Sequence, residues 1–187
     1  MKTNIIALFI LILGIHLSAQ DFNTNVNGLK SEKQLKKERK EAEIERQYLA
    51  TSLFLDSMQF VLEADYLSGS TGIRSMVTPF LNFILVDSTK GIIQTGRDSG
   101  FGSNGVGGAT AKGTITNWKL TKSDKKKNFY VQIDFSTNFG FYTVFMDVSA
   151  DGNASARLTG ISRGSLTFDG SLIPLRKSKV FKAISGY

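Results

Sequence analysis

The stretch GIIQTGRDSGFGSNGVGGATAKG, residues 91–113, decides how the rest of this chain can fold. It holds eight of the 18 glycines in a chain of 187 residues. Glycine reaches positive φ angles and lets two backbones approach closely, at a cost in conformational entropy. The stretch is therefore either a phosphate-binding loop or a long turn that leads into a closely packed strand.

Residues 100–105 match the GxGxxG pattern of dinucleotide-binding loops. That pattern carries meaning only between a strand and a helix, with an acidic residue about 20 positions later. The residues after Gly108 alternate like a strand, so no helix N-terminus is predicted to face an anion. Thr114 stands where the Walker motif requires lysine. We therefore interpret four glycines as structural, at a bulge or a close strand contact: Gly105, Gly107, Gly108 and Gly113.

The N-terminus has the organisation of a secretory signal peptide. A positive start at Lys2 precedes an apolar run over residues 5–13, which is too short to span a bilayer, and Ala19 offers a small residue for cleavage. We expect residues 1–19 to be removed, although an uncleaved anchor is the alternative. Residues 20–30 then form a flexible leader and residues 31–187 a single domain. The expected location is periplasmic or secreted, with no transmembrane segment after cleavage.

The mature chain would contain neither histidine nor cysteine, because His16 lies in the signal peptide and the sequence has no cysteine. This excludes Ser-His-Asp and Cys-His nucleophiles and the usual zinc ligand sets. Carboxylate pairs, lysine, tyrosine or serine with lysine remain possible catalysts, so the case for an enzyme is weakened. We predict no catalytic residue, no metal and no cofactor. The formal net charge of +7 permits anionic partners, but export argues against nucleic acid.

A helix is predicted from Ser31 to about Asp56. Ser31 and Gln34 have the spacing of a capping box. The first half of the helix is charged nearly all round, whereas apolar residues return at helical spacing from Ile44 onward. We expect only the second half to dock on the body of the protein.

Strands are predicted for most of the remaining chain. Residues 58–66 alternate, with Phe60 and Tyr66 on the expected buried face and Glu63 and Asp65 sharing the other face. Residues 80–86 form a continuous apolar run, which is typical of a strand covered on both faces. Five antiparallel strands should follow the glycine stretch, at residues 110–121, 129–136, 141–149, 154–161 and 165–172. Residues 176–184 are expected to be an edge strand guarded by lysines, or else an anion-binding surface.

Several segments in this order resemble family 4251 of the domains of unknown function, exported proteins of Bacteroidota. The segments are the signal peptide, the charged helix, residues 60–65, Pro79 with Asn82 and Phe83, residues 104–108, residues 112–115, residues 151–154, and Gly170 with Leu172 and Pro174. The resemblance covers most of the mature chain. It implies an exported protein and supplies no catalytic residue, since the family has no assigned activity. Many relatives look like lipoproteins, whereas this chain lacks the cysteine that would be acylated.

Together these features predict a mainly β protein: a curled antiparallel sheet or barrel-like meander of about eight strands with one N-terminal helix. The expected function is a non-catalytic envelope binding or structural protein. Its partner would be an envelope component or a small apolar or amphipathic ligand in the concavity of the sheet. Candidate ligand-binding residues are Arg97, Asn104 and Trp118. The alternative is a glycan hydrolase that joins Glu63 or Asp65 to a second acid, whereas a filled interior would favour a structural role.

Overall fold

The computed structural model describes residues 31–97, 107–160 and 164–182. The predicted signal peptide, the leader, Asn104 and Gly105 lie outside these ranges. The described elements are α1 (Glu32–Asp56), β1 (Gln59–Gly69), β2 (Arg74–Met76), β3 (Phe83–Asp87), β4 (Lys90–Thr95), β5 (Ala109–Ser123), β6 (Asn128–Thr137), β7 (Gly140–Ser149), β8 (Asn153–Gly160), β9 (Ser165–Pro174) and a short 3₁₀ turn at Leu175–Lys177.

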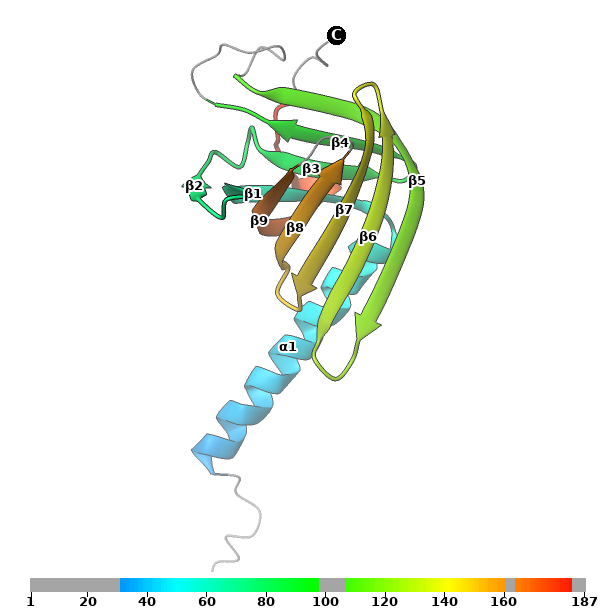
Figure 1. Cartoon of the computed structure of the whole chain (residues 1–187). Coiled ribbons are helices and arrows are strands. Elements are labelled where there is room, and N and C mark those ends of the chain that lie inside the picture. The colour runs from blue at the N-terminus through cyan, green and yellow to red at the C-terminus, as the bar shows by residue number, and fades with distance from the viewer. Residues whose placement is uncertain (1–30, 98–106, 161–163, 183–187) are drawn as a thin grey trace, which may run out of the picture.

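All nine described strands pair antiparallel in the order β2-β1-β3-β4-β5-β6-β7-β8-β9, and β1 also pairs with β9. This second pairing closes eight strands into a barrel and leaves β2 as an extra strand on the edge of β1 (Figure 1). The short hairpin connections of the sequence account for the meander, since antiparallel neighbours need only a few linking residues. The predicted fold class is confirmed.

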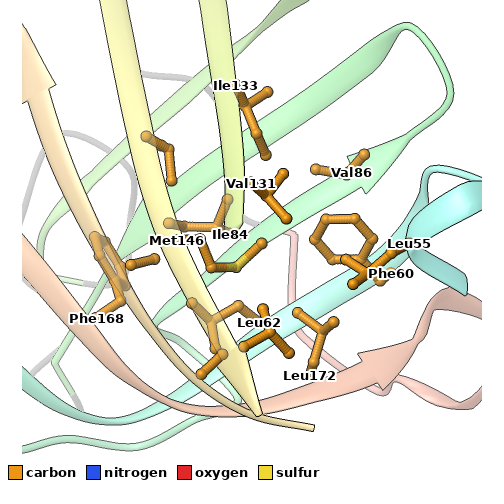
Figure 2. Packing of buried hydrophobic residues seen from close by; sticks show 14 of the residues in the cluster. Leu55, Phe60, Leu62, Ile84, Val86, Val131, Ile133, Met146, Phe168 and Leu172 are labelled. Atoms are coloured by element: carbon orange, nitrogen blue, oxygen red, sulfur yellow. The ribbon is translucent and has the colours of Figure 1, made fainter. Parts of the chain in front are cut away.

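The inward side chains fill the interior of the barrel. Phe60, Phe129, Phe135 and Phe168 are fully buried there. Figure 2 shows apolar side chains from α1, β1, β3, β6, β7 and β9 meeting in one cluster. Eight strands enclose a space only just wide enough for side chains. Because these side chains occupy the interior, the barrel has no room for the ligand that was expected in the concavity of the sheet, and by the criterion stated above the filled interior favours a structural role. A ligand could bind only at an end or on the outside of this barrel.

Helix α1 closes one end of the barrel with its second half only. Leu55 is completely buried in the core, and the ring of Tyr48 stacks on Phe129 at 4.6 Å. The predicted capping box is present: the Gln34 amide donates to Ser31 Oγ at 3.3 Å, and the Ser31 amide donates to Gln34 Oε1 at 3.0 Å. Every residue from 31 to 43 is exposed, and this half projects away from the barrel (Figure 1).

Strand β1 departs from the predicted alternation because it contains a β-bulge. Ala64 pairs with Gly170 but Tyr66 pairs with Asp169, so Asp65 is the extra residue. The bulge moves Tyr66 to the outer face, which corrects the prediction that it shares the buried face of Phe60.

Residues 175–182 do not form the predicted edge strand. They cross the outside of β1, β3 and β4 as a C-terminal strap, and they cover Phe83 and Leu85 on the outer face. Gln94 Nε2 holds the strap by donating to the Phe181 carbonyl at 2.8 Å. The strap explains why residues 83–86 are buried on both faces. Residues 80–82 belong to the preceding turn and not to β3, contrary to the prediction.

Candidate functional site

The end of the barrel where β1 finishes holds a cavity of about 710 Å³, which we call the mouth pocket. Its floor consists of Leu67, Val77 and Leu166, which pack against the filled core. Ile73 and Met76, beside and on β2, form an apolar rim, and their side chains are 72% and 77% exposed. The mouth pocket is thus a mixed surface above a closed core: its floor and part of its rim are apolar, whereas polar side chains and backbone make up the rest of its lining.

Arg97 is the cationic residue among those that line this pocket. The buried side chain of Asn82 pairs with the backbone of Gly96, the residue before Arg97, as a neighbouring strand would. The Gly96 amide donates to Asn82 Oδ1 at 3.0 Å, and Asn82 Nδ2 donates to the Gly96 carbonyl at 3.0 Å. This clamp fixes the backbone just before Arg97. Within residues 31–97, 107–160 and 164–182, the Arg97 guanidinium makes no ion pair or hydrogen bond.

The glycines at the end of the glycine-rich stretch allow close backbone contact. Gly107 has a φ of +71°, a conformation that favours glycine. A Cβ atom on Gly108 would lie 2.2 Å from the Thr95 carbonyl oxygen, and one on Gly113 would lie 2.1 Å from the Ser136 carbonyl oxygen. These contacts give three of the four proposed structural glycines a steric reason. Gly105 and Asn104 cannot be placed because they lie outside the described residues.

Trp118 does not contribute to the mouth pocket. It lies further along β5, and its ring contacts Phe60 at a centroid distance of 5.9 Å near the start of β1. Arg97 follows β4, whose end pairs with the start of β5. The structure therefore does not bring the candidate residues Arg97 and Trp118 together.

A second concavity, the outer groove, lies on the outside of β1 and β7–β9 and has a volume of about 640 Å³. Asp65, Asp147 and Asp169 line it. Asp169 is engaged on both oxygens: Ser155 Oγ donates to Oδ1 at 2.7 Å, and Arg74 Nε lies 3.4 Å from Oδ2. The described residues contain no cluster of three or more acidic, histidine or cysteine side chains that could hold a metal ion.

Glu63 does not join Asp65 in the outer groove. Its Oε1 atom accepts a hydrogen bond of 2.6 Å from Ser178 Oγ in the C-terminal strap. The predicted pair of carboxylates is therefore divided between two sites, and the partner acids of Asp65 in the groove come from β7 and β9.

A third concavity of about 550 Å³, the basal groove, lies between α1 and the end of β9. Leu53, Phe54 and Leu172 contribute apolar surface, and Arg176 and Lys177 stand at its edge. Arg46, which also lines this groove, is committed to Glu43 by hydrogen bonds of 2.9 and 2.6 Å. That hydrogen-bonded contact holds the pKa of Glu43 below its usual value.

Hydrogen bonds shift the pKa values of several groups that hold the framework together. The pKa of Asp134 is lowered, first by the hydrogen bond from Asn117 and then by that from Thr143. Burial raises the pKa of Tyr48, and the hydrogen bond to Asp124 adds to this shift. These groups join strands or dock the helix, so their shifts reflect structural contacts and not a catalytic centre.

Sequence reasoning gave no role to Asn82 or Gln94, although both are buried polar residues that organise the mouth and the strap. The available signal was a polar residue inside an apolar strand run, because a buried amide must find hydrogen-bond partners. Gly170 was also given no structural role. Its Cβ atom would lie 2.0 Å from the Glu63 carbonyl oxygen, next to the bulge in β1.

No helix in the described part of the chain is long and apolar enough to cross a membrane. A search of curated proteins finds no match to this chain. Among solved structures, the chain resembles a DUF4251 family protein from Bacteroides eggerthii, a crystal structure at 1.95 Å resolution. The two are 30% identical, with a TM-score of 0.61 over 73% of this chain and 93% of the other. The model of that family, a domain of unknown function, matches residues 42–172, and this chain therefore belongs to the DUF4251 family.

Proposed function

We propose that this chain is an exported, non-catalytic binding protein whose mouth pocket holds a small amphipathic molecule with an acidic group. One observation carries the proposal: Arg97 stands beside an apolar floor of Leu67, Val77 and Leu166. Ligand sites commonly combine apolar walls with a few fixed polar groups. A guanidinium that is free of ion pairs among the described residues suits a carboxylate, sulfonate or phosphate.

The filled core limits the size of this ligand. Because the aromatic side chains already occupy the interior, an apolar tail can lie only across the floor and against Ile73 or Met76. A short acyl or aromatic group fits this description better than a long lipid chain. The clamp from Asn82 to Gly96 supports the proposal, since it holds the backbone beside the cation in one position.

Anilinonaphthalene sulfonate is a suitable probe because it joins an aromatic body to a sulfonate and fluoresces in apolar surroundings. The variant Arg97→Gln should weaken its binding roughly tenfold, since a hydrogen bond to a charged group contributes about 1.5 kcal/mol or more. Arg176→Gln is the matched control, because it removes a cation from the basal groove and leaves the mouth intact. Equal loss in both variants, or no loss in Arg97→Gln, would refute the mouth pocket as the site.

Export is supported by the signal-peptide pattern and is tested separately. The protein recovered from the periplasm or medium of the producing cell should begin near Gln20, as measured by intact mass. Retention of residues 1–17, or an added lipid, would contradict this part of the proposal.

The second candidate, a carboxylate-dependent glycan hydrolase, has one observation in its favour. Asp65 and Asp147 line the same outer groove, where Asn128 Oδ1 is buried without a hydrogen-bond partner among the described residues. Two carboxylates that flank a glycan are the minimum for acid–base hydrolysis. We expect the wild-type protein to release no reducing ends from soluble glucans or peptidoglycan fragments. Release that is abolished by Asp65→Asn and by Asp147→Asn would replace the binding proposal with this one.

A further inference from the structure

The C-terminal strap has an inner and an outer side. Val180 packs inward on the apolar cluster that β1 and β3 form on the outside of the barrel, and Ser178 Oγ donates to Glu63 Oε1 at 2.6 Å. Successive side chains of an extended chain point to opposite sides, so these two anchors turn Lys179 outward. The exposed lysines of the strap, which we call the lysine row, are Lys177, Lys179 and Lys182.

The lysine row has no acidic partner within residues 31–97, 107–160 and 164–182. No ion pair or side-chain hydrogen bond in these ranges involves its ammonium groups. Lys112 of β5 is exposed on the same side of the sheet, since it pairs with Ile92, which packs on the outer cluster. Glu63 and Asp87 supply negative charge on this side, but Glu63 already accepts a hydrogen bond from the strap and Asp87 lies opposite Lys90 in the β3–β4 hairpin. The outward side of the strap is therefore basic.

Two exposed aromatic rings stand at the end of the lysine row. Phe80 and Phe181 stack with their ring centroids 6.0 Å apart, and they are 47% and 46% exposed. The Phe181 amide donates to the Phe80 carbonyl at 3.0 Å, so the pair is fixed to the strap next to Lys182. The strap thus presents cations and an aromatic pair side by side.

The shape of the lysine row distinguishes between the anions that it could bind. Lys177 and Lys182 are separated by at most about 16 Å along an extended chain, and the row lies on an outward side that no other element covers. A small anion is held by polar groups that converge in a pocket, which this row does not provide. Neighbouring lysines are about 7–10 Å apart, close to one Debye length, so their fields add along a line. The row therefore suits an extended anionic surface.

The aromatic pair favours a lipid surface over other extended anions. An acidic polysaccharide or polypeptide could neutralise the lysines, but it offers no apolar layer to Phe80 and Phe181. A bilayer offers both, because its headgroups carry the negative charge and aromatic rings insert at the boundary between headgroups and acyl chains. Each lysine near an anionic bilayer strengthens binding about fivefold, so the three lysines together contribute roughly a hundredfold.

We propose that the lysine row and the aromatic pair dock this chain on the surface of a membrane that contains anionic lipids. The lysines contact the headgroups, and the rings of Phe80 and Phe181 enter the boundary layer. Docking brings the mouth pocket to the membrane, because Phe80 lies between Thr78 and Asn82, which both line this pocket. Binding through the strap does not require a ligand in that pocket.

Co-sedimentation with vesicles measures this interaction for the mature chain, which starts at Gln20. The chain should bind vesicles of equal parts phosphatidylcholine and phosphatidylglycerol, and it should not bind vesicles of phosphatidylcholine alone. Replacing all three residues of the lysine row by glutamine should weaken binding about a hundredfold. The matched control removes the same charge from the exposed half of α1, with Lys33→Gln, Lys36→Gln and Lys40→Gln, and should weaken binding by less than about threefold. The thermal midpoint checks that both triple variants are folded.

Three results of this experiment would overturn the proposal. They are a wild-type chain that does not bind the anionic vesicles, equal binding to the neutral vesicles, and an equal loss of binding in the two triple variants. Dissolved polyglutamate, at the same concentration of negative charge, should leave most of the chain on the vesicles because it offers no layer for the aromatic rings. Displacement of most of the chain would indicate an acidic polymer as the partner and would also overturn the proposal.

A second fluorophore tests which side of the barrel meets the membrane. Phe181→Trp places a tryptophan in the aromatic pair. Phe145→Trp is the matched control, since Phe145 is 49% exposed on the outside of β7, across the closed barrel from β3. Lipids with brominated acyl chains should quench the added emission of Phe181→Trp and spare that of Phe145→Trp, with the emission of Trp118 in the wild type as the baseline. Equal quenching of the two variants, or no quenching of Phe181→Trp, would refute docking through the strap.

Discussion

Gly113→Ala tests whether the glycine stretch is structural. Gly113 lies in β5 and pairs with Gly91 on one side and Thr137 on the other. An added Cβ atom would lie 2.1 Å from the Ser136 carbonyl oxygen and 2.8 Å from its carbonyl carbon, where real Cβ atoms are essentially never closer than 3.0 Å. The obstacle is backbone, so β5 and β6 must move apart. We expect a loss of about 1–3 kcal/mol in the free energy of unfolding, which is the usual cost of forcing extra atoms into a packed site.

This loss corresponds to a fall of about 2–12 °C in melting temperature for a chain of this length. Urea unfolding can be followed by the fluorescence of Trp118, the single tryptophan, which packs against the core. Gly69→Ala is the matched control, because nothing lies within 4 Å of its added Cβ atom and its φ angle is not positive. Gly69→Ala should be neutral or slightly stabilising. Equal stability of the two variants would refute the steric reasoning.

Three further predictions concern the helix, the strap and the strands. Deleting residues 31–43 together with the preceding leader should change the melting temperature by no more than about 3 °C at low micromolar concentration. The reason is that these residues are exposed and their ion pairs contribute little to stability. A larger fall in the melting temperature, measured by differential scanning calorimetry, would contradict this prediction. Gln94→Ala should lower the free energy of unfolding by about 2 kcal/mol or more and speed proteolysis of the C-terminal strap, because the Leu81 and Phe181 carbonyls lose their hydrogen-bond donor. A variant with unchanged urea unfolding and unchanged protease resistance would contradict this prediction. Hydrogen bonds lower the pKa of Asp134 in the folded chain, so its stabilising contribution is complete above about pH 4 and is lost as pH falls through the lowered pKa. Asp134→Asn should therefore have a lower free energy of unfolding than wild type at pH 7, and the difference measured by urea unfolding should narrow toward pH 2. A difference that stays constant with pH would contradict this role of Asp134.

Most of the fold could be predicted because its signals are local. The capping box set the start of α1, and the short turns after the glycine stretch set the antiparallel neighbours. The features that were missed depend on contacts distant in sequence. The bulge at Asp65 reflects the approach of β1 to Gly170, and the strap is held in place by Gln94. Alternation within one segment cannot reveal either contact.

Less of the candidate site than of the fold could be predicted from the sequence. Arg97 lines a pocket, but Trp118 lies elsewhere in the barrel, and Glu63 and Asp65 separate because the bulge and the strap intervene. Convergence of side chains depends on register and closure, which composition and spacing do not encode. The polar residues Asn82 and Gln94 could have been recognised as special, since each interrupts an apolar run of the sequence.

Different elements cover the different sides of the barrel, and this arrangement determines where a binding surface can form. The second half of α1 closes one end with Leu55 and Tyr48, and the strap covers the outside of β3 and β4. The core fills the interior of this barrel, so binding surfaces can arise only at its ends or on its outside. The mouth pocket is one such place, since its floor is core and its rim is exposed.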